Sequence, residues 1–326
     1  MNLSSDSPLK ELMMRKLGED YERNLFSVGK NKILMKLLKK ALIADVRSLL
    51  SEYNMNSPPF DPFKIKQIGN ATVEIVYLPK NKIGADGSLE VGNKGFIIKL
   101  NQDLLNNKSK KYYLRTTMAH ELMHTFFYNT NGPPFDLIGS RDFYSEELPM
   151  REELCNFLAR EFLFPSFYAN ELKENRSKLL LPSIENIEFL KKEFILSSNV
   201  IAFRMIKDFS FWDAAFAKYV QYGKKYKSST IVKNKLNNFY NKIKSPKFLS
   251  SNKQNVLKNN LFDHFDYLFE LGKVTDYLFE LGKVTKCIKI YSHKLKVESK
   301  KLKVESKIDS VKPLSFFMLI YEDNEI

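Results

Sequence analysis

His120-Glu121-Leu122-Met123-His124 is the stretch of this 326-residue chain that most constrains its fold. An α-helix brings residues four positions apart onto one face, so His120 and His124 can bind the same metal ion. Glu121 between them can then take up a proton from a water molecule on that ion. The alternative is an ordinary helix that matches the HExxH pattern by accident. Because the chain has only four histidines and two of them stand at ligand spacing, we favour the metal site.

The residues around this motif predict one helix over 111–130. An apolar row at four-residue spacing runs through Leu114, Met118, Leu122 and Phe126. The cluster Asn131-Gly132-Pro133-Pro134 predicts the end of the helix, because these residues form turns and break helices. Both histidines are therefore expected inside the helix. A catalytic zinc ion still needs a third protein ligand and one open position.

A second predicted helix, which begins near Arg151 and is closed by Pro165, is the expected source of the third ligand. Its apolar face comprises Leu154, Phe157, Leu158, Phe162 and Leu163. Glu152 and Asn156 share another face, so the carboxylate can bind zinc while the amide bonds to a ligand histidine. Spacing alone leaves other assignments open. Glu152 could be an ordinary solvated carboxylate, and three neighbours could replace it: Glu146, Glu147 and Glu153.

Together the two segments resemble the ImmA/IrrE family of metallopeptidases, in which HELGH is followed by E-x-x-A-N-x-F-A-x-x-L-L-M-P. The likeness covers roughly residues 60–210 and selects Glu152 over Glu153 as the third ligand. Residues 84–101 resemble the hairpin that precedes the family's active-site helix, and residues 196–205 resemble its later Ser-led helix. This chain departs from the pattern at three positions, with Met123 for Gly, Cys155 for Ala and Leu158 for Phe.

The resemblance implies an α+β, zincin-like fold with a small antiparallel sheet packed on the HExxH helix. It implies Zn²⁺ held by His120, His124 and Glu152. Glu121 would accept the water proton and later deliver it to the leaving amine. Three residues stay open as donors to the oxyanion: Tyr128, Tyr144 and Arg204. The strand expected over 95–101 is a candidate edge on which a substrate docks as an added strand.

The function implied by the resemblance is that of a zinc-dependent endopeptidase that cleaves a cytoplasmic DNA-binding repressor, and so induces a mobile element or a stress regulon. This chain has no evident helix-turn-helix signature, so the repressor would be a separate protein. Two other functions remain open. One is a zincin-like module that binds a regulator without cutting it, although the intact Glu121 weighs against it. The other is a nucleic-acid-binding protein that uses the basic C-terminal region.

Composition narrows these alternatives. Residues 211–310 contain 21 lysines, no arginine and nine acidic residues, and so carry most of the net charge of +14. Such a region can bind nucleic acid, but without arginine it is poorly suited to reading bases, and we favour a solvated surface. Two cysteines are too few for a disulfide framework. We find no membrane-length apolar run and no secretion signal, and therefore predict a cytoplasmic location.

Three regions are expected along the chain. They are an N-terminal helical segment over 1–56, a zincin-like metallopeptidase domain over 57–225 and a basic, Lys-rich accessory region over 226–326. In the last region two short segments recur unchanged in tandem, within 266–285 and 294–307. Two copies are too few for a solenoid. The sequence leaves the oligomeric state open.

Overall fold

The computed structural model describes eight stretches of the chain: residues 8–24, 30–105, 111–138, 148–222, 225–233, 290–297, 300–311 and 314–322. The chain divides into two compact units. Unit 1 comprises Met1–Ala169 and Lys192–Ser197, and unit 2 comprises Asn170–Lys191 and Ser198–Ile326. Helices and sheets both contribute to the fold, which confirms the predicted α+β class.

Unit 1 begins with three helices, α1 (Pro8–Leu17), α2 (Glu19–Asn24) and α3 (Lys30–Glu52). The helical character predicted for the N-terminal segment is therefore confirmed where the chain is described. α3 packs against α1 and α6. It buries a stripe made of Leu34, Leu38, Leu42, Val46, Leu49 and Leu50. Apolar residues at three- and four-residue spacing produce such a stripe, which here anchors the N-terminal helices to the site-bearing part of unit 1.

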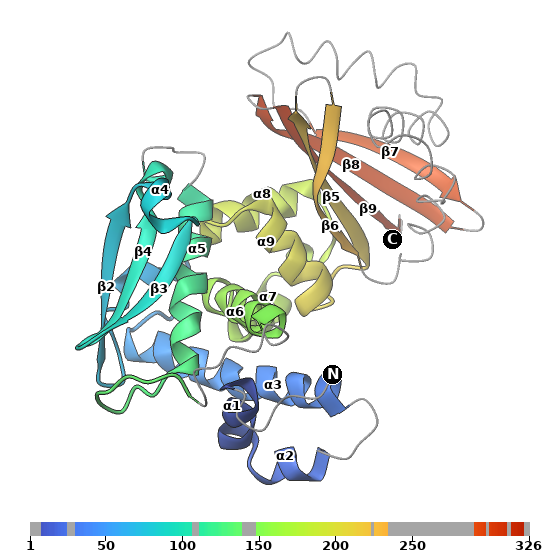
Figure 1. Ribbon diagram of the computed structural model, residues 1–326. Coiled ribbons are helices and arrows are strands. Elements are labelled where there is room, and N and C mark those ends of the chain that lie inside the picture. Colours follow the sequence, from blue (N-terminus) through green and yellow to red (C-terminus); the bar gives the residue numbers. More distant parts are fainter. Residues whose placement is uncertain are drawn as a thin grey trace, which may run out of the picture. The chain divides into compact units, whose positions relative to one another are not determined.

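The sheet of unit 1 is mixed (Figure 1). Its spatial order is β1 (Gln67–Ile68), β2 (Ala71–Leu78), β4 (Gly95–Asn101) and β3 (Gly87–Gly92). β2 and β4 are parallel, whereas β3 and β4 form the antiparallel hairpin expected within 84–101. The purely antiparallel sheet that we expected is therefore wrong. The chain passes from β2 through α4 (Lys80–Ile83) to β3, and the hairpin then inserts β4 between β2 and β3.

The strand over 95–101, which we expected to offer a docking edge, is not an edge strand. β4 has β2 on one side and β3 on the other, so both sides of its backbone are used. Phe96, Ile98 and Leu100 of β4 are buried as well. Among the described strands of this sheet, β3 is the edge strand near the predicted site. An added strand would therefore pair with β3 and not with residues 95–101.

Asp86 fastens the beginning of β3 to its surroundings. Its carboxylate accepts hydrogen bonds from Asn101 Nδ2 at 3.0 Å and from the Tyr113 hydroxyl at 3.0 Å, and it lies 3.2 Å from Lys80 Nζ. Its backbone oxygen accepts a hydrogen bond from Asn101 N. These hydrogen bonds, that from Asn101 above all, hold the pKa of Asp86 below its usual value. The start of β3 is thereby tied to the end of β4 and to α5.

α5 (Lys111–His124) carries the motif and lies between the sheet and α6 (Figure 1). The single helix predicted over 111–130 ends earlier, at His124, and tightens into the 3-10 turn η4 (Thr125–Phe127). Thr125 Oγ1 donates to the Leu122 carbonyl oxygen at 2.6 Å, so a side chain competes with the helical backbone there. Tyr128 is then extended. His124 is thus the last helical residue and still lies one turn beyond His120.

The second predicted helix is confirmed as α6 (Leu148–Leu163), with Pro165 just after its end. Its face against α5 and α3 includes Leu154, Leu158 and Phe162, all fully buried. Two further helices follow, α7 (Ser166–Asn175) and α8 (Ile184–Phe194). Besides η4, short 3-10 turns among the described residues include η1 (Pro62–Lys64), η2 (Gln102–Leu104) and η5 (Ser177–Leu180).

Unit 2 contains α9 (Ser198–Ala202), the π-helical turn η6 (Phe203–Asp208) and a five-stranded antiparallel sheet. The strands in spatial order are β6 (Lys225–Lys233), β5 (Ala214–Tyr222), β9 (Leu314–Glu322), β8 (Lys300–Val311) and β7 (Ile290–Val297). Trp212 is fully buried, and its Nε1 donates to the Leu179 carbonyl oxygen at 3.1 Å. Trp212 is therefore a core residue of unit 2.

The predicted domain limit at residue 225 stays a prediction. β5 precedes this limit, but it pairs with β6 and with β9, which follow it. A truncation that tests the limit should therefore also be made upstream of β5. The duplicated segment 266–285 lies outside the described residues. Among the helices that the structure describes, none is both long and apolar enough to cross a membrane.

Candidate metal centre

Three side chains from α5 and α6 converge in unit 1. His120 and His124 stand one turn apart on α5, and Glu152 reaches them from the first turns of α6. One potential ligand atom from each residue lies within 4.8 Å of the others. The structure thus brings together the three residues that the sequence analysis assigned to a metal ion. Glu153 points elsewhere, because its carboxylate accepts a hydrogen bond from Lys39 Nζ at 2.7 Å, and Glu146 and Glu147 lie outside the described residues.

The spacing of these atoms suits a zinc ion. His120 Nε2 is 3.1 Å from His124 Nε2 and 3.0 Å from Glu152 Oε2, and His124 Nε2 is 3.5 Å from Glu152 Oε1. In a tetrahedral site with metal–ligand bonds of about 2.0–2.2 Å, ligand atoms lie about 3.3–3.6 Å apart. Two nitrogens and one oxygen are also a donor set that zinc accepts. The first two separations lie a few tenths of an ångström below this range and the third lies within it, so the residues present fit this ion in chemistry and nearly fit it in size.

Glu121 lies beside the cluster and is 8% exposed. β3 approaches it closely at Gly87, where a Cβ atom would lie 2.8 Å from Glu121 Oε1 and 2.6 Å from Thr117 Cγ2. Real Cβ atoms do not approach other atoms this closely, so any other residue at position 87 would force the Thr117 and Glu121 side chains to shift. The role of Gly87 could not be predicted from the sequence, because the contact joins segments that are far apart in the chain.

Burial perturbs the proton affinity of two residues of the motif. It raises the pKa of Glu121 to about 7, and the negative charge of Glu152 adds to this rise. It lowers the pKa of His124 to about 3, and the electrostatic effects of His120 and Arg151 act in the same direction. His124 is therefore a neutral imidazole at physiological pH, which is the form that binds metal ions.

The second nitrogen of His124 has a partner other than the one we expected. Cys155 Sγ lies 3.3 Å from His124 Nδ1, whereas Asn156, which we expected to hold a ligand histidine, is exposed on the cavity wall. If His124 binds a metal ion through Nε2, Nδ1 carries the proton and donates it toward the sulfur. Burial raises the pKa of the Cys155 thiol well above its usual value, so the sulfur stays protonated. Met123, the other departure from the family pattern beside His124, is fully buried.

The cluster lies in a cavity of about 590 Å³ between β3, α5 and the first turns of α6. Of the three candidate oxyanion donors, Tyr128 lines this cavity. Arg204 belongs to unit 2, where its Nη1 donates to Asp208 Oδ2 at 3.0 Å, and Tyr144 lies outside the described residues. Arg151, which sequence reasoning overlooked, also lines the cavity and is 4% exposed, with its guanidinium 4.6 Å from the centre of the Phe127 ring.

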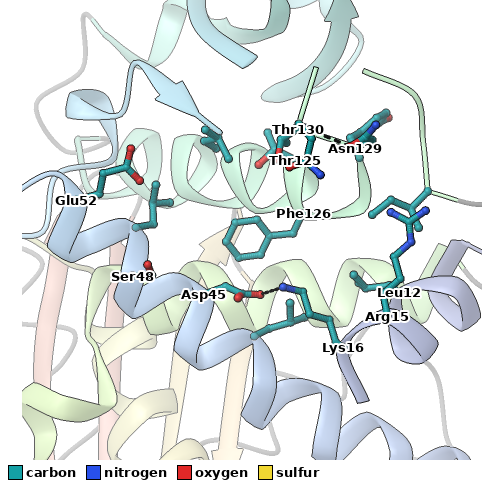
Figure 2. A pocket seen from close by; sticks show the side chains of 16 residues that line it. Leu12, Arg15, Lys16, Asp45, Ser48, Glu52, Thr125, Phe126, Asn129 and Thr130 are labelled. Atoms are coloured by element: carbon teal, nitrogen blue, oxygen red, sulfur yellow. Dashed lines mark hydrogen bonds and ion pairs between the residues drawn. The ribbon is translucent and has the colours of Figure 1, made fainter. Parts of the chain in front are cut away.

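Unit 1 has a second cavity, of about 410 Å³, beside α1, α3 and the segment that follows α5 (Figure 2). Its buried walls include Leu12 and Leu42, and Lys16 Nζ pairs there with Asp45 Oδ2 at 2.6 Å. Tyr128 lines both cavities.

No model of a known protein family matches this chain, and no curated protein matches it either.

Proposed function

We propose that this protein is a zinc-dependent endopeptidase of the ImmA/IrrE type with a zincin-like fold. The observation that carries the proposal is the convergence of His120, His124 and Glu152 on one point, with the Glu121 carboxylate beside it. Their donor atoms support it, since they lie 3.0–3.5 Å apart, near the separations of a tetrahedral zinc site although two of them are slightly shorter. So does the open cavity around them, since a catalytic metal ion needs access to substrate.

His124 has the charge state that such a site requires. His120 and His124 would bind through Nε2, and Glu152 would supply the negative charge. Burial keeps His124 neutral, because it lowers the pKa of this residue to about 3. A zinc ion held by three protein ligands acts as a Lewis acid and lowers the pKa of water in its open position to about 7.

Glu121 is the candidate general base. Its carboxylate would take up a proton from the attacking water and later release it to the leaving amine. With a pKa raised to about 7, this carboxyl group can exchange protons near neutral pH, although a cation in the cluster would lower that pKa. Gly87 covers one side of the carboxylate and so limits its contact with solvent.

The cavity also supplies groups that could orient a peptide. Tyr128 and Arg151 line it and are candidate donors to the oxygen of the carbonyl group that is attacked. The edge of β3 passes the same cavity at Gly87, Ser88 and Leu89. An extended peptide could hydrogen-bond to this edge as an added strand. This mode of binding suits an endopeptidase, because it leaves both ends of the peptide free.

The expected substrate rests on the family resemblance and is a helix-turn-helix repressor. The alternative of a non-catalytic zincin-like binding module fits less well, since such a module has no need for a buried carboxylate beside its metal ligands. A nucleic-acid-binding protein would depend on the basic C-terminal region, and no observation in the described residues favours it.

Metal analysis combined with one substitution tests the proposal. The purified full-length protein should contain or take up about one zinc ion per chain. Glu121→Gln should keep this zinc, but cleavage of a mixed peptide library should fall by about 10²–10⁴-fold, because the amide cannot accept the proton. Glu153→Gln, one position round α6 from Glu152, is the matched control and should cleave normally. A protein that binds no transition metal would overturn the proposal, as would undiminished cleavage by Glu121→Gln.

A further inference from the structure

The cavity that contains the histidine–glutamate cluster has an apolar component that the proposed chemistry does not use. Leu89, Tyr113 and Leu148 all line it. Leu148 is 49% exposed and Tyr113 is 50% exposed, although large apolar side chains are usually covered. Exposed apolar groups that gather around a functional cavity commonly mark contacts with a ligand.

Leu89 and Leu148 lie close to the candidate catalytic groups along their own elements. Gly87 faces Glu121, and Leu89 is two residues further along β3, on the same face and about 6.7 Å away. Leu148 is four residues before Glu152, which is one turn of α6 or about 6 Å. Both distances match the spacing between neighbouring side chains on one face of an extended peptide.

The two leucines lie toward the Tyr128 side of the cavity. β3 pairs Val91 with Phe96, and the Phe96 ring lies 5.5 Å from the Tyr128 ring. β3 therefore runs from Tyr113, which is bonded to Asp86, toward Tyr128. On α6, Leu148 precedes Arg151, which lies over Phe127. Tyr113 thus stands at the opposite end of the cavity from this pair.

We propose that Leu89 and Leu148 form a subsite that binds one apolar side chain of the substrate, next to the bond that is cleaved. The inference rests on the proposed function. An extended peptide on the edge of β3 would direct alternate side chains into the cavity. The substrate side chain nearest to Glu121 would then contact these two leucines. A leucine-sized side chain would bury apolar surface there, whereas glycine at the same position would leave Leu148 exposed and Leu89 half-buried, as they are now.

Binding of hydroxamates to the zinc-loaded full-length protein tests this without any known substrate. Three probes separate the questions: acetohydroxamate, N-acetyl-glycine hydroxamate and N-acetyl-leucine hydroxamate, with each dissociation constant measured by calorimetry. Acetohydroxamate reports the open position on the metal ion and therefore the proposed function. The ratio of the other two reports the subsite. We expect the leucine compound to bind about tenfold more tightly than the glycine compound, from burial of part of its side chain.

Substitution identifies the residues responsible. In Leu148→Ala and in Leu89→Ala the leucine preference should fall to about threefold or less, with little change for acetohydroxamate. Leu105→Ala is the matched control, since Leu105 is also 49% exposed in unit 1 but does not line the cavity. Equal binding of the leucine and glycine compounds, or a preference that survives both substitutions, would overturn the subsite and leave the metal site standing. Failure of acetohydroxamate to bind a zinc-loaded protein would overturn the proposed function itself.

Discussion

The two cavities of unit 1 differ in how their charged groups are arranged. In the cavity beside α1 and α3, Lys16 and Asp45 pair at 2.6 Å, so opposite charges neutralise each other. In the cavity between α5 and α6, two imidazole nitrogens face each other at 3.1 Å, and the Glu121 carboxyl group is buried near the charge of Glu152. The first cavity thus contains an ion pair whose charges cancel. The second brings together electron-pair donors, which a bound cation would stabilise.

The largest expected effect contrasts these cavities directly. His120→Ala or His124→Ala should reduce zinc from about one ion per chain to near zero, because two remaining ligands hold zinc poorly. Lys16→Ala and Asp45→Ala remove charges from the other cavity and should leave zinc unchanged. Elemental analysis of dialysed protein measures both sets. Equal zinc loss in the two sets would mean that the substitutions act by destabilising unit 1. The two cavities would then not differ in their role in zinc binding.

A smaller difference in zinc binding is expected between two neighbouring residues of α6, Glu152 and Glu153. Glu152→Ala should weaken zinc binding severely, since it removes the anionic ligand. Glu153→Ala should have little effect, because this side chain is 66% exposed and pairs with Lys39 across to α3. Competition with a chelating dye gives both affinities. A larger loss in Glu153→Ala than in Glu152→Ala would reverse the assignment of the third ligand.

The buried charge of Glu121 should be visible in the stability of metal-free protein. Its pKa rises from 4.5 to about 7 on folding, so the folded state holds a proton that the unfolded state releases between these values. Stability is therefore lost as pH rises through about 7. Glu121→Gln removes this loss. The free energy of unfolding of Glu121→Gln relative to wild type should therefore increase by on the order of 2–3 kcal/mol from pH 4 to pH 8.

Thermal unfolding at the two pH values measures this change. Zinc is the control, because a cation near Glu121 lowers its pKa and should shrink the difference between the two proteins. A difference that is the same at both pH values would show that Glu121 is not perturbed by burial. The contribution of His124 is common to both proteins and cancels in the comparison.

Features set by spacing within one helix could be predicted from the sequence. His120 and His124 share a face because they are four residues apart, and the apolar row of α6 places Glu152 on a definite side. Selecting Glu152 required the family resemblance, and the structure then brought it to the histidines. Features that depend on pairing between distant segments could not be predicted. The insertion of β4 between β2 and β3 is one, and the approach of Gly87 to Glu121 is another.

The end of α5 at His124 shows a third limit. The apolar spacing in the sequence continues to Phe126. In the structure, Thr125 Oγ1 hydrogen-bonds back to the Leu122 carbonyl oxygen, and the chain then pairs with residues 136–138. Local competition of this kind leaves no trace in the period of apolar residues. The partner of His124 Nδ1 has a similar origin. Cys155 and Asn156 are adjacent on α6 and lie about 100° apart around its axis, so the rotational position of the helix decides which of them meets the histidine.

The smallest expected effect tests whether Cys155 or Asn156 is the partner of His124 Nδ1. Cys155→Ala should weaken zinc binding by about tenfold, the lower end of the range for losing the partner of a ligand histidine, because Nδ1 loses the sulfur at 3.3 Å. Cys155→Ser should retain part of the affinity, since a hydroxyl group can also accept a hydrogen bond from Nδ1. Asn156→Ala should change affinity less than Cys155→Ala, because Asn156 is exposed on the cavity wall. Chelator competition on all three proteins ranks them. If Asn156→Ala proves the most damaging, the amide holds the histidine in the zinc-loaded protein, as the shared helix face of Glu152 and Asn156 predicted, and the sulfur is a packing contact.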